Sequence, residues 1–291
     1  MPELPEVEVT RRRIGPLLVG RRIARIETTR PSYFFLTRPA ALRAGLVGRE
    51  VRELARRGKY LVAALDDGAR LVLHLGMTGQ LFSAGATSPR LLSAGARSAL
   101  APEEQQRFEP DAHTHLRLAF EDGGPEVLFR DVRKFGKVLL LRGGASHPRI
   151  DRLGVDALEL SGEALFAASR GRRVATKALL LDQAVATGVG NIYADEALFR
   201  AGIRPRRRAG ALTRRECEAL AEAVRAVLLR SIETGGSSIR DYVAPDGVDG
   251  AFQDERRVYA RGGEPCLVCG TAIRRVVVAQ RGTHYCPRCQ R

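Results

Sequence analysis

Four of the five cysteines of this chain lie in its last 26 residues, as two close pairs. Cys266 and Cys269 form one pair, Cys286 and Cys289 form the other, and sixteen residues separate the pairs. This C-x₂-C…C-x₂-C spacing is typical of a zinc ribbon, in which each pair supplies two thiolates to one tetrahedral ion. A redox C-x-x-C site fits less well, because there are two pairs and no thioredoxin-like βαβ context.

The segment between the two cysteine pairs is expected to form a β-hairpin over residues 273–285. Arg281 lies at its expected tip, so the zinc would position an arginine and take no part in chemistry; a solvated surface arginine is the alternative. Cys217 stands apart in a helical pattern and is expected to be a buried, inert thiol. We therefore expect residues 254–291 to form a zinc-ribbon domain.

The first half of the chain carries strand signals separated by turn residues. They predict a mostly antiparallel β domain over residues 1–147, a sandwich or flattened barrel. Residues 83–112 are poor in large apolar side chains and are expected to be a long insertion loop. The expected strands are residues 22–28, 51–54, 60–65, 70–75, 115–120, 127–130 and 137–141.

From about residue 151 the apolar pattern becomes helical, and we place a domain boundary within residues 143–150. Thr213 and Glu216 have the spacing of a capping box, and Gly235 lies where that helix should end. Residues 148–253 are expected to form a helical domain, so the fold class is α+β. The expected helices are residues 161–169, 177–183, 193–200 and 213–233.

The composition favours a polyanionic partner. Lys and Arg number 48 against 33 Asp and Glu, a formal net charge of +15, which is typical of nucleic-acid binding. A high-GC genome, which enriches arginine and alanine, is an alternative source of this excess. The chain has no apolar run of about 18 residues and begins with acidic residues rather than a signal peptide, so we expect a cytoplasmic protein without a membrane segment.

The N-terminus could carry a reactive amine. Processing normally removes a first Met that precedes a small residue, which would expose the secondary amine of Pro2. An α-amino group has a pKa of about 8, so a useful fraction is unprotonated and nucleophilic at neutral pH. Adding it to an aldehyde-like sugar carbon gives an iminium that stays cationic, and Glu3 and Glu6 supply nearby carboxyls. Alternatively, Pro2 only permits cleavage and the glutamates are first-turn anions of a helix over residues 5–18.

A glycine-rich turn at residues 188–191 lies between two expected helices. Its backbone N–H groups and the amide of Asn191 suit a phosphate. Many helix hairpins turn on glycine, so this pattern alone is a weak signal.

Six features occur together in one order, and in combination they resemble bacterial formamidopyrimidine-DNA glycosylases over nearly the whole chain except residues 83–112. The features are the start Pro-Glu-Leu-Pro-Glu-Val-Glu, Arg57-Gly-Lys59-Tyr60, His74-Leu-Gly-Met77-Thr-Gly, Arg133-Lys-Phe135-Gly, Gly-Val-Gly-Asn-Ile-Tyr at 188–193, and the C-terminal zinc ribbon.

The resemblance implies four catalytic residues. Pro2 would be the Schiff-base nucleophile on C1′ of the damaged nucleotide, and Glu3 the acid that acts on the deoxyribose. Lys59 would donate the proton associated with β-elimination and contact a phosphate. Arg281 would bind phosphate and support δ-elimination.

The resemblance also implies a set of DNA contacts. Met77, Arg133 and Phe135 would fill the hole left by an everted base, and Arg133 would face the orphaned cytosine. Flipping a base out of the helix costs a few kcal/mol, and side chains inserted as wedges in its place help to offset that cost. Asn191 and Tyr193 would belong to a helix–two-turns–helix DNA-binding element. Further DNA-contacting positions are Glu6, His113 and Arg172.

The expected function is therefore a bifunctional DNA glycosylase and AP lyase for oxidised purines, chiefly 8-oxoguanine opposite cytosine and formamidopyrimidines. The resemblance implies one structural zinc ion, no organic cofactor, double-stranded DNA as partner and a monomer. The preference among damaged bases is the property that the resemblance defines least. The reasons are the insertion at 83–112 and the loose match of the lesion-covering loop at 237–252.

Two alternatives remain open from the sequence. The first is an endonuclease VIII-like glycosylase for oxidised pyrimidines, although Leu4 and the Arg133-Lys-Phe135 segment resemble the purine branch more closely. The second is a non-catalytic protein that binds damaged DNA through its basic surface and zinc ribbon. The presence of all four matched catalytic residues disfavours it.

Overall fold

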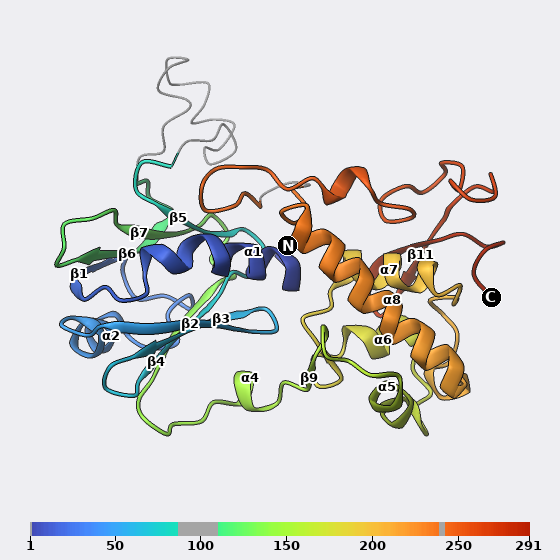
Figure 1. Cartoon of the computed structure of the whole chain (residues 1–291), viewed down its shortest axis with the longest axis horizontal. Coiled ribbons are helices and arrows are strands. Elements are labelled where there is room, and N and C mark those ends of the chain that lie inside the picture. Colours follow the sequence, from blue (N-terminus) through green and yellow to red (C-terminus); the bar gives the residue numbers. More distant parts are fainter. Residues whose placement is uncertain (1, 87–109, 239–241) are drawn as a thin grey trace, which may run out of the picture. The chain divides into compact units, whose positions relative to one another are not determined.

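The structure is a computed structural model, and it describes residues 2–86, 110–238 and 242–291. The chain separates into two compact units (Figure 1). The first comprises residues up to His147 together with Thr234–Ala251, and the second comprises Pro148–Glu233 and Phe252–Arg291. The expected three-domain division stays a prediction; in this partition, residues 234–251 group with the first unit.

The first unit is built on two four-stranded sheets, ordered β2-β3-β4-β8 and β1-β6-β7-β5, in which every pairing is antiparallel. This confirms the expected antiparallel β architecture. The strands are β1 (Ile23–Thr28), β2 (Val51–Arg57), β3 (Tyr60–Leu65), β4 (Arg70–His74), β5 (Gly79–Ser83), β6 (Thr114–Phe120), β7 (Val127–Asp131) and β8 (Lys137–Leu141).

Two elements of this unit are absent from the sequence-based expectation: the edge strand β5 and the helix α2 (Pro39–Leu46). Strand β5 begins at Gly79, where an added Cβ would lie 2.1 Å from the carbonyl oxygen of Leu75. Glycine therefore starts this strand because the preceding turn passes too close for a side chain, and a Gly-Gln start carries little strand signal.

Helix α1 (Leu4–Ile14) begins the described chain and packs against β2, β3 and β5 (Figure 1). The helix expected over residues 5–18 is shorter in the structure, because Pro16 has no N–H to continue the hydrogen-bond ladder. A 3₁₀ turn, η1 (Gly15–Leu17), replaces its last turn. Val7 and Ile14 are fully buried and join the core of the sandwich.

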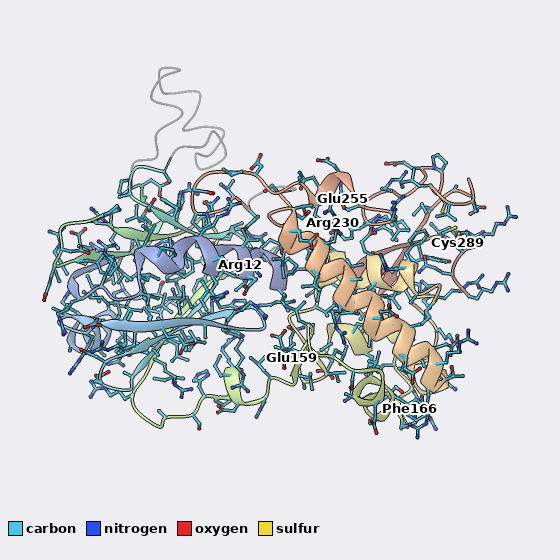
Figure 2. All side chains as sticks on the ribbon, in the orientation of Figure 1. Arg12, Glu159, Phe166, Arg230, Glu255 and Cys289 are labelled. Carbon is cyan, nitrogen blue, oxygen red and sulfur yellow. The ribbon has the colours of Figure 1, made fainter. Side chains whose placement is uncertain are left out.

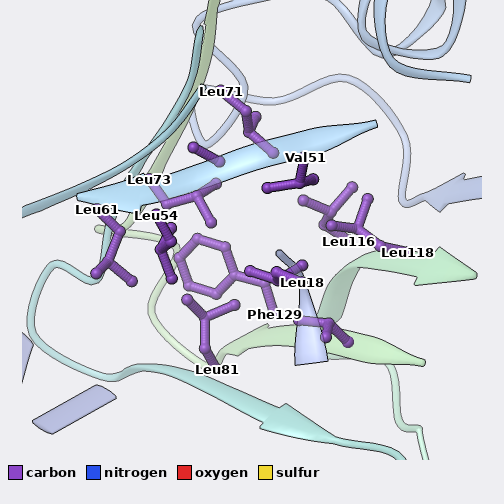
Figure 3. A pocket seen from close by; sticks show the side chains of 12 residues that line it. Leu18, Val51, Leu54, Leu61, Leu71, Leu73, Leu81, Leu116, Leu118 and Phe129 are labelled. Carbon is purple, nitrogen blue, oxygen red and sulfur yellow. The ribbon is translucent and has the colours of Figure 1, made fainter. Parts of the chain in front are cut away.

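The two sheets enclose a small apolar cavity in their shared core (Figure 3). Its volume is about 10 Å³, and its lining comes from Leu18 and from strands of both sheets, including Ala63 and Phe129. A void of this size without polar partners does not hold an ordered water. The interior of the sandwich is therefore close-packed and dry.

The second unit contains the helices expected between residues 161 and 233, with ends that differ by one or two residues. Thr213 and Glu216 form the expected capping box: the Glu216 N–H donates to Thr213 Oγ1 at 3.2 Å and the Thr213 N–H to Glu216 Oε2 at 2.8 Å. Cys217 is fully buried, as expected. The main helices are α5 (Gly162–Ser169), α6 (Thr176–Leu181), α7 (Asn191–Arg200) and α8 (Arg214–Glu233).

Shorter elements complete the second unit. A parallel pair, β9 (Val155–Asp156) and β10 (Ala186–Thr187), joins two loops. The antiparallel hairpin β11 (Arg274–Val278) and β12 (Arg281–Tyr285) confirms the predicted C-terminal hairpin. The remaining turns are α4 (Pro148–Asp151), η3 (Ala209–Ala211) and η4 (Phe252–Asp254).

The expected insertion at 83–112 falls largely on residues 87–109, which lie outside the described residues. Its described ends, 84–86 and 110–112, lie outside helices and strands, and only Ser83 belongs to a strand. Ser83 is the last residue of β5, and Asp111 is tied to the buried Arg130 by an ion pair of 2.9 Å. Among the described residues, no helix is long and apolar enough to cross a membrane.

The cavity predicts how the sandwich core responds to a larger side chain. Ala63 is 2% exposed and lines the cavity, but about 10 Å³ is far less than three added carbons require. We expect Ala63→Leu to lower the free energy of unfolding by about 1–3 kcal/mol through overpacking. Ala64→Leu, which points to the opposite face of β3, should change it by less than about 0.5 kcal/mol. Urea denaturation measures both, and a more stable Ala63→Leu variant would show that the core is loosely packed.

Candidate active site

The N-terminal segment is held by a reciprocal capping box at the start of α1. The backbone N–H of Glu3 donates to Oε2 of Glu6 at 2.8 Å, and the Glu3 carboxylate accepts the backbone N–H of Glu6. Both glutamates are 1% exposed, and Pro2 is also buried. The backbone that follows the Pro2 nitrogen is thus fixed by the hydrogen bonds of Glu3.

The Glu6 carboxylate has a second structural partner. Its Oε1 accepts the backbone N–H of Ser237 at 2.8 Å, and the Tyr242 hydroxyl donates to the Glu6 carbonyl at 3.2 Å. Burial and the neighbouring Glu6 charge raise the pKa of Tyr242 well above its usual range, so the phenol stays protonated. Because both carboxylate oxygens bind backbone N–H groups, the Glu6 side chain links the start of α1 to Ser237, and its contact with DNA stays a prediction.

The Glu8 carboxylate binds three guanidinium groups, and one of them, from Arg56, anchors α1 to the sheet. Its carboxylate accepts from Arg11 and Arg12 on the same helix, each at 2.8 Å, and from Arg56 of β2 at 3.1 Å. Figure 2 labels Arg12 on this helix. Burial raises the pKa of Glu8, but the hydrogen bonds from Arg11 and Arg12 and the Arg11 and Arg56 charges lower it more, to about 2.

Lys59 lies at the tip of the two-residue turn between β2 and β3, where Arg57 pairs with Tyr60. Gly58 supplies the left-handed conformation that such a turn requires, at φ 58°. Lys59 is half-buried. The local sequence thus explains its position: Gly58 permits the turn, and the strands on either side carry the lysine.

Met77, Arg133 and Phe135 belong to two loops that lie against each other. Gly76 has φ 67°, and an added Cβ there would be 2.5 Å from the backbone of Phe135 and of Gly136. Met77 is 37% and Phe135 42% exposed, and the Arg133 guanidinium lies 4.5 Å from the centroid of the Phe135 ring. The structure thus brings the expected trio together as an exposed cluster.

Asp131 is the buried carboxylate that joins the two loops. Its Oδ1 accepts from the Thr78 hydroxyl at 2.5 Å and from the Arg133 N–H at 3.2 Å, and its Oδ2 accepts from the Gly136 N–H at 2.6 Å. Sequence reasoning missed it, although a single acid before Arg133-Lys-Phe was visible. The sequence signal that could have identified Asp131 is an acidic residue at the end of an expected strand, just before a turn.

Two histidines flank the same loop. His113 is half-buried, and its carbonyl accepts the Asp131 N–H at 2.9 Å. His115 is 1% exposed, and its Nε2 lies 2.9 Å from the Asp131 carbonyl oxygen. Burial lowers the pKa of His115, which keeps the ring neutral. His113 therefore lies beside the exposed cluster, and its contact with DNA stays a prediction.

In the second unit, buried polar groups position the strand that begins with Arg281. Lys177 and Asp195 are both fully buried and form an ion pair of 2.7 Å. Lys177 Nζ also donates to Thr283 Oγ1 at 2.8 Å and to the Gly282 carbonyl at 3.2 Å. Sequence reasoning missed this pair, because a lysine in a helical pattern is normally solvated.

Asn191, the first residue of α7, donates its amide to the Gly282 carbonyl at 3.0 Å. Arg281 itself is exposed and pairs with Val278 as the first residue of β12. This corrects the expected hairpin tip: the turn is formed by Ala279 and Gln280, at φ 49° and 59°. Left-handed conformations of such residues cost about 1–3 kcal/mol each, so the surrounding contacts hold this turn.

Arg172 and Tyr193, two further residues that were expected to contact DNA, lie in contrasting environments. Arg172 is exposed and forms an ion pair with Asp182 at 2.8 Å. Tyr193 is 1% exposed, its hydroxyl lies 2.6 Å from Ser231 Oγ, and its ring packs 5.4 Å from that of Phe252. The Tyr193 side chain thus packs within the helical unit, and the contact of this residue with DNA stays a prediction.

The four predicted zinc ligands converge at one point of the second unit. Their sulfur atoms all lie within 4.8 Å of one another, with Cys266 and Cys289 at 3.9 Å and Cys269 and Cys286 at 3.4 Å. Zinc–sulfur bonds of about 2.3 Å in a tetrahedron place the sulfurs roughly 3.8 Å apart, so the donor set fits one zinc ion. Figure 2 labels Cys289 of this cluster.

Family models match three consecutive parts of the chain. Residues 1–138 match the formamidopyrimidine-DNA glycosylase N-terminal domain, residues 153–243 the H2TH domain of the same enzyme, and residues 263–291 the zinc finger found in FPG and IleRS. The formamidopyrimidine-DNA glycosylase of Cupriavidus pinatubonensis is 45% identical over 312 residues, with all of both chains covered. The chain belongs to the formamidopyrimidine-DNA glycosylase (Fpg) family.

Solved Fpg structures share the fold. The crystal structure of MutM (Fpg) from Thermus thermophilus has a TM-score of 0.83 and 40% identity, and covers 99% of this chain and 98% of its own. A Lactococcus lactis Fpg variant in complex with Fapy-dG-containing DNA has a TM-score of 0.85 and 34% identity, with both chains fully covered. The family confirms the α+β fold with a helix–two-turns–helix region and a zinc finger.

The anchoring of α1 in this Fpg protein predicts a pH-dependent stability. The pKa of Glu8 is about 2 in the folded chain against an ordinary 4.5, so its contribution is fully present above about pH 4.5 and lost as the pH falls through 2. We expect Glu8→Gln to lower the free energy of unfolding by about 3 kcal/mol at pH 7. Denaturant titrations from pH 7 to 2 should show this difference shrinking; a difference independent of pH would contradict the ion-pair account.

The buried pair of the helical unit predicts a strong non-additive effect. Lys177→Met leaves the Asp195 charge buried without its partner, so we expect a loss of about 3–5 kcal/mol of unfolding free energy. Adding Asp195→Asn removes that charge and keeps the acceptor for the His284 N–H, so the double variant should be more stable than the single one. Denaturation in zinc-containing buffer measures both. A double variant that shows the sum of both losses would contradict the pairing.

Proposed function

We propose that this protein is a bifunctional DNA glycosylase and AP lyase of base-excision repair that removes oxidised purines from double-stranded DNA. The observation that carries the proposal is the Glu3–Glu6 box, which fixes the backbone next to Pro2 while the wedge residues Met77, Arg133 and Phe135 are presented by the same unit. A relative of this chain is crystallised with Fapy-dG-containing DNA, which supports purine lesions over pyrimidine lesions.

The reaction begins at the Pro2 nitrogen once Met1 has been removed. The amine attacks C1′, the glycosidic bond breaks, and the base leaves with the bonding electrons and takes up a proton. Glu3 protonates the sugar ring oxygen as the ring opens. The iminium nitrogen formed from a secondary amine carries no hydrogen, so the iminium cannot lose its positive charge by deprotonation. This permanent cation makes the neighbouring C2′ proton more acidic.

Two eliminations then cut the DNA strand. Removal of the C2′ proton expels the 3′ phosphate in the β-elimination, and a second proton loss expels the 5′ phosphate in the δ-elimination. Lys59 and Arg281 serve these steps as cations for the phosphates, and Lys59 also as a proton donor. Zinc bound by the four cysteines holds the ribbon from which Arg281 projects.

The remaining residues bind the substrate. Met77 and Phe135 replace stacking lost when the damaged nucleotide leaves the helix, and Arg133 meets the base left opposite. Asn191, Arg172 and His113 contact the phosphate backbone. The charge of +15 makes this binding salt-dependent. All of these groups lie in one chain, so we infer a monomer, and the chromosomal substrate implies a cytoplasmic, nucleoid-associated location.

The proposal is tested by blocking the Pro2 nitrogen without changing any other group. A variant with one extra large residue between Met1 and Pro2 retains Met1, so the Pro2 nitrogen becomes an amide and cannot attack. We expect excision of 8-oxoguanine and Fapy lesions to fall by at least about 10²-fold, while binding of duplex DNA persists. Pro2→Gly, whose primary amine gives an imine that can lose its proton, should be intermediate.

Quenched-flow or gel assays on defined duplexes measure these rates, with a thymine-glycol duplex to separate purine from pyrimidine lesions. Full activity in the extended variant would show that the nucleophile lies elsewhere. Preferential cleavage of thymine glycol by the unmodified enzyme would instead move the substrate to oxidised pyrimidines.

A further inference from the structure

Tyr33 is an exposed aromatic residue beside the wedge loop, which we define as residues 131–137. Its side chain is 60% exposed, and its hydroxyl donates to the Arg133 carbonyl at 2.9 Å. The neighbouring Phe34 is fully buried and packs 4.9 Å from the Phe129 ring. The ring of Tyr33 is therefore carried by a rigid part of the chain and reaches out to the loop.

The segment that follows Tyr33 is hydrogen-bonded to β8, which begins where the wedge loop ends. The Val138 N–H donates to the Phe34 carbonyl at 3.0 Å, and the Leu36 N–H donates to the Val138 carbonyl at 2.9 Å. Tyr33 and the end of the loop are consequently fixed to the same strand. A movement of the loop relative to Tyr33 would break the contact from the hydroxyl to Arg133.

Lys137 holds the other carbonyl groups of the loop. Its Nζ donates to the carbonyls of Lys134 at 3.4 Å, Phe135 at 3.2 Å and Gly136 at 2.9 Å. The same ammonium lies 5.0 Å from the centroid of the Tyr33 ring. Tyr33 and Lys137 thus occupy all four carbonyls from residue 133 to 136 and also contact each other.

The loop has a conformation that needs such support. Lys134 is in the left-handed region at φ 57°, which is unfavourable for a residue with a side chain. On the opposite side, Asp131 accepts the N–H groups of Arg133 and Gly136. Two N–H groups of the loop are thus held by the Asp131 carboxylate, and its carbonyls from 133 to 136 are held by Tyr33 and Lys137.

We propose that Tyr33 and Lys137 are positioning residues that hold the wedge loop and thereby set which base opposite the lesion the enzyme accepts. The proposal rests on the proposed function, in which Arg133 meets the opposite base. An arginine distinguishes bases because its N–H groups point to particular acceptor atoms of the base. This orientation requires that the backbone carrying the arginine be fixed to within about 0.5 Å. Tyr33 acts through the carbonyl of Arg133 itself, the residue whose direction matters.

The test compares single-turnover excision of 8-oxoguanine opposite cytosine and opposite adenine. Tyr33→Phe removes one hydroxyl and retains the ring over which Lys137 lies. We expect its cytosine-to-adenine rate ratio to fall about three- to tenfold, the factor that one net hydrogen bond is worth. Lys137→Met should lower the ratio as well, and the double variant should fall by less than the product of the two effects.

Two further measurements separate positioning from general damage. Cleavage of a single-stranded abasic oligonucleotide needs no opposite base, so both variants should retain it. Arg43→Met, which removes an exposed cation from α2 of the same unit, is the matched control for Lys137→Met and should keep the wild-type ratio.

An unchanged ratio in both Tyr33→Phe and Lys137→Met overturns the proposal, and so does equal slowing opposite cytosine and adenine. If the wild-type enzyme excises no lesion, the proposed function fails and the proposal falls with it. The two failures are distinguishable, because the wild-type enzyme excises the lesion if only the Tyr33 and Lys137 proposal is wrong and does not excise it if the proposed function is wrong.

Discussion

The carboxylate of Glu6 is the group on which the arrangement of the N-terminus depends. A buried carboxylate is costly unless its oxygens are satisfied, and Glu6 accepts two backbone N–H groups, from Glu3 and from Ser237. One of these bonds fixes the start of α1, and the other fixes residues far along the chain. A single side chain thus sets the backbone position that follows the Pro2 nitrogen, and substitution at Glu6 would loosen the start of the helix and the backbone at Ser237 together.

Charge serves two purposes in this protein. Some cations are consumed by structure: Arg11, Arg12 and Arg56 surround Glu8, and Lys177 neutralises Asp195 inside the helical unit. Other cations are exposed and available to a polyanion, and the whole chain has a net charge of +15. A formal charge alone does not separate these groups, because burial and pairing decide which cations face solvent.

Structural features that are determined by residues close together in the sequence could be predicted. The zinc cluster follows from the spacing of four cysteines, the capping box of α8 from Thr213 and Glu216, and most strands from alternating apolar residues. Features that depend on distant partners could not. The burial of Tyr193 depends on Ser231 and Phe252, and the structural role of Glu6 depends on Ser237; neither partner can be predicted from the residues next to Tyr193 or Glu6 in the sequence.

The central claim is that the Pro2 nitrogen forms the covalent bond to the damaged nucleotide. The most direct measurement is borohydride reduction during reaction with 8-oxoguanine DNA, followed by nuclease and protease digestion and mass spectrometry of the peptides. The account predicts that the sugar remnant is attached to the nitrogen of Pro2, in a peptide that lacks Met1. Attachment to the side chain of Lys59 or of another lysine, with Pro2 unmodified, would contradict it.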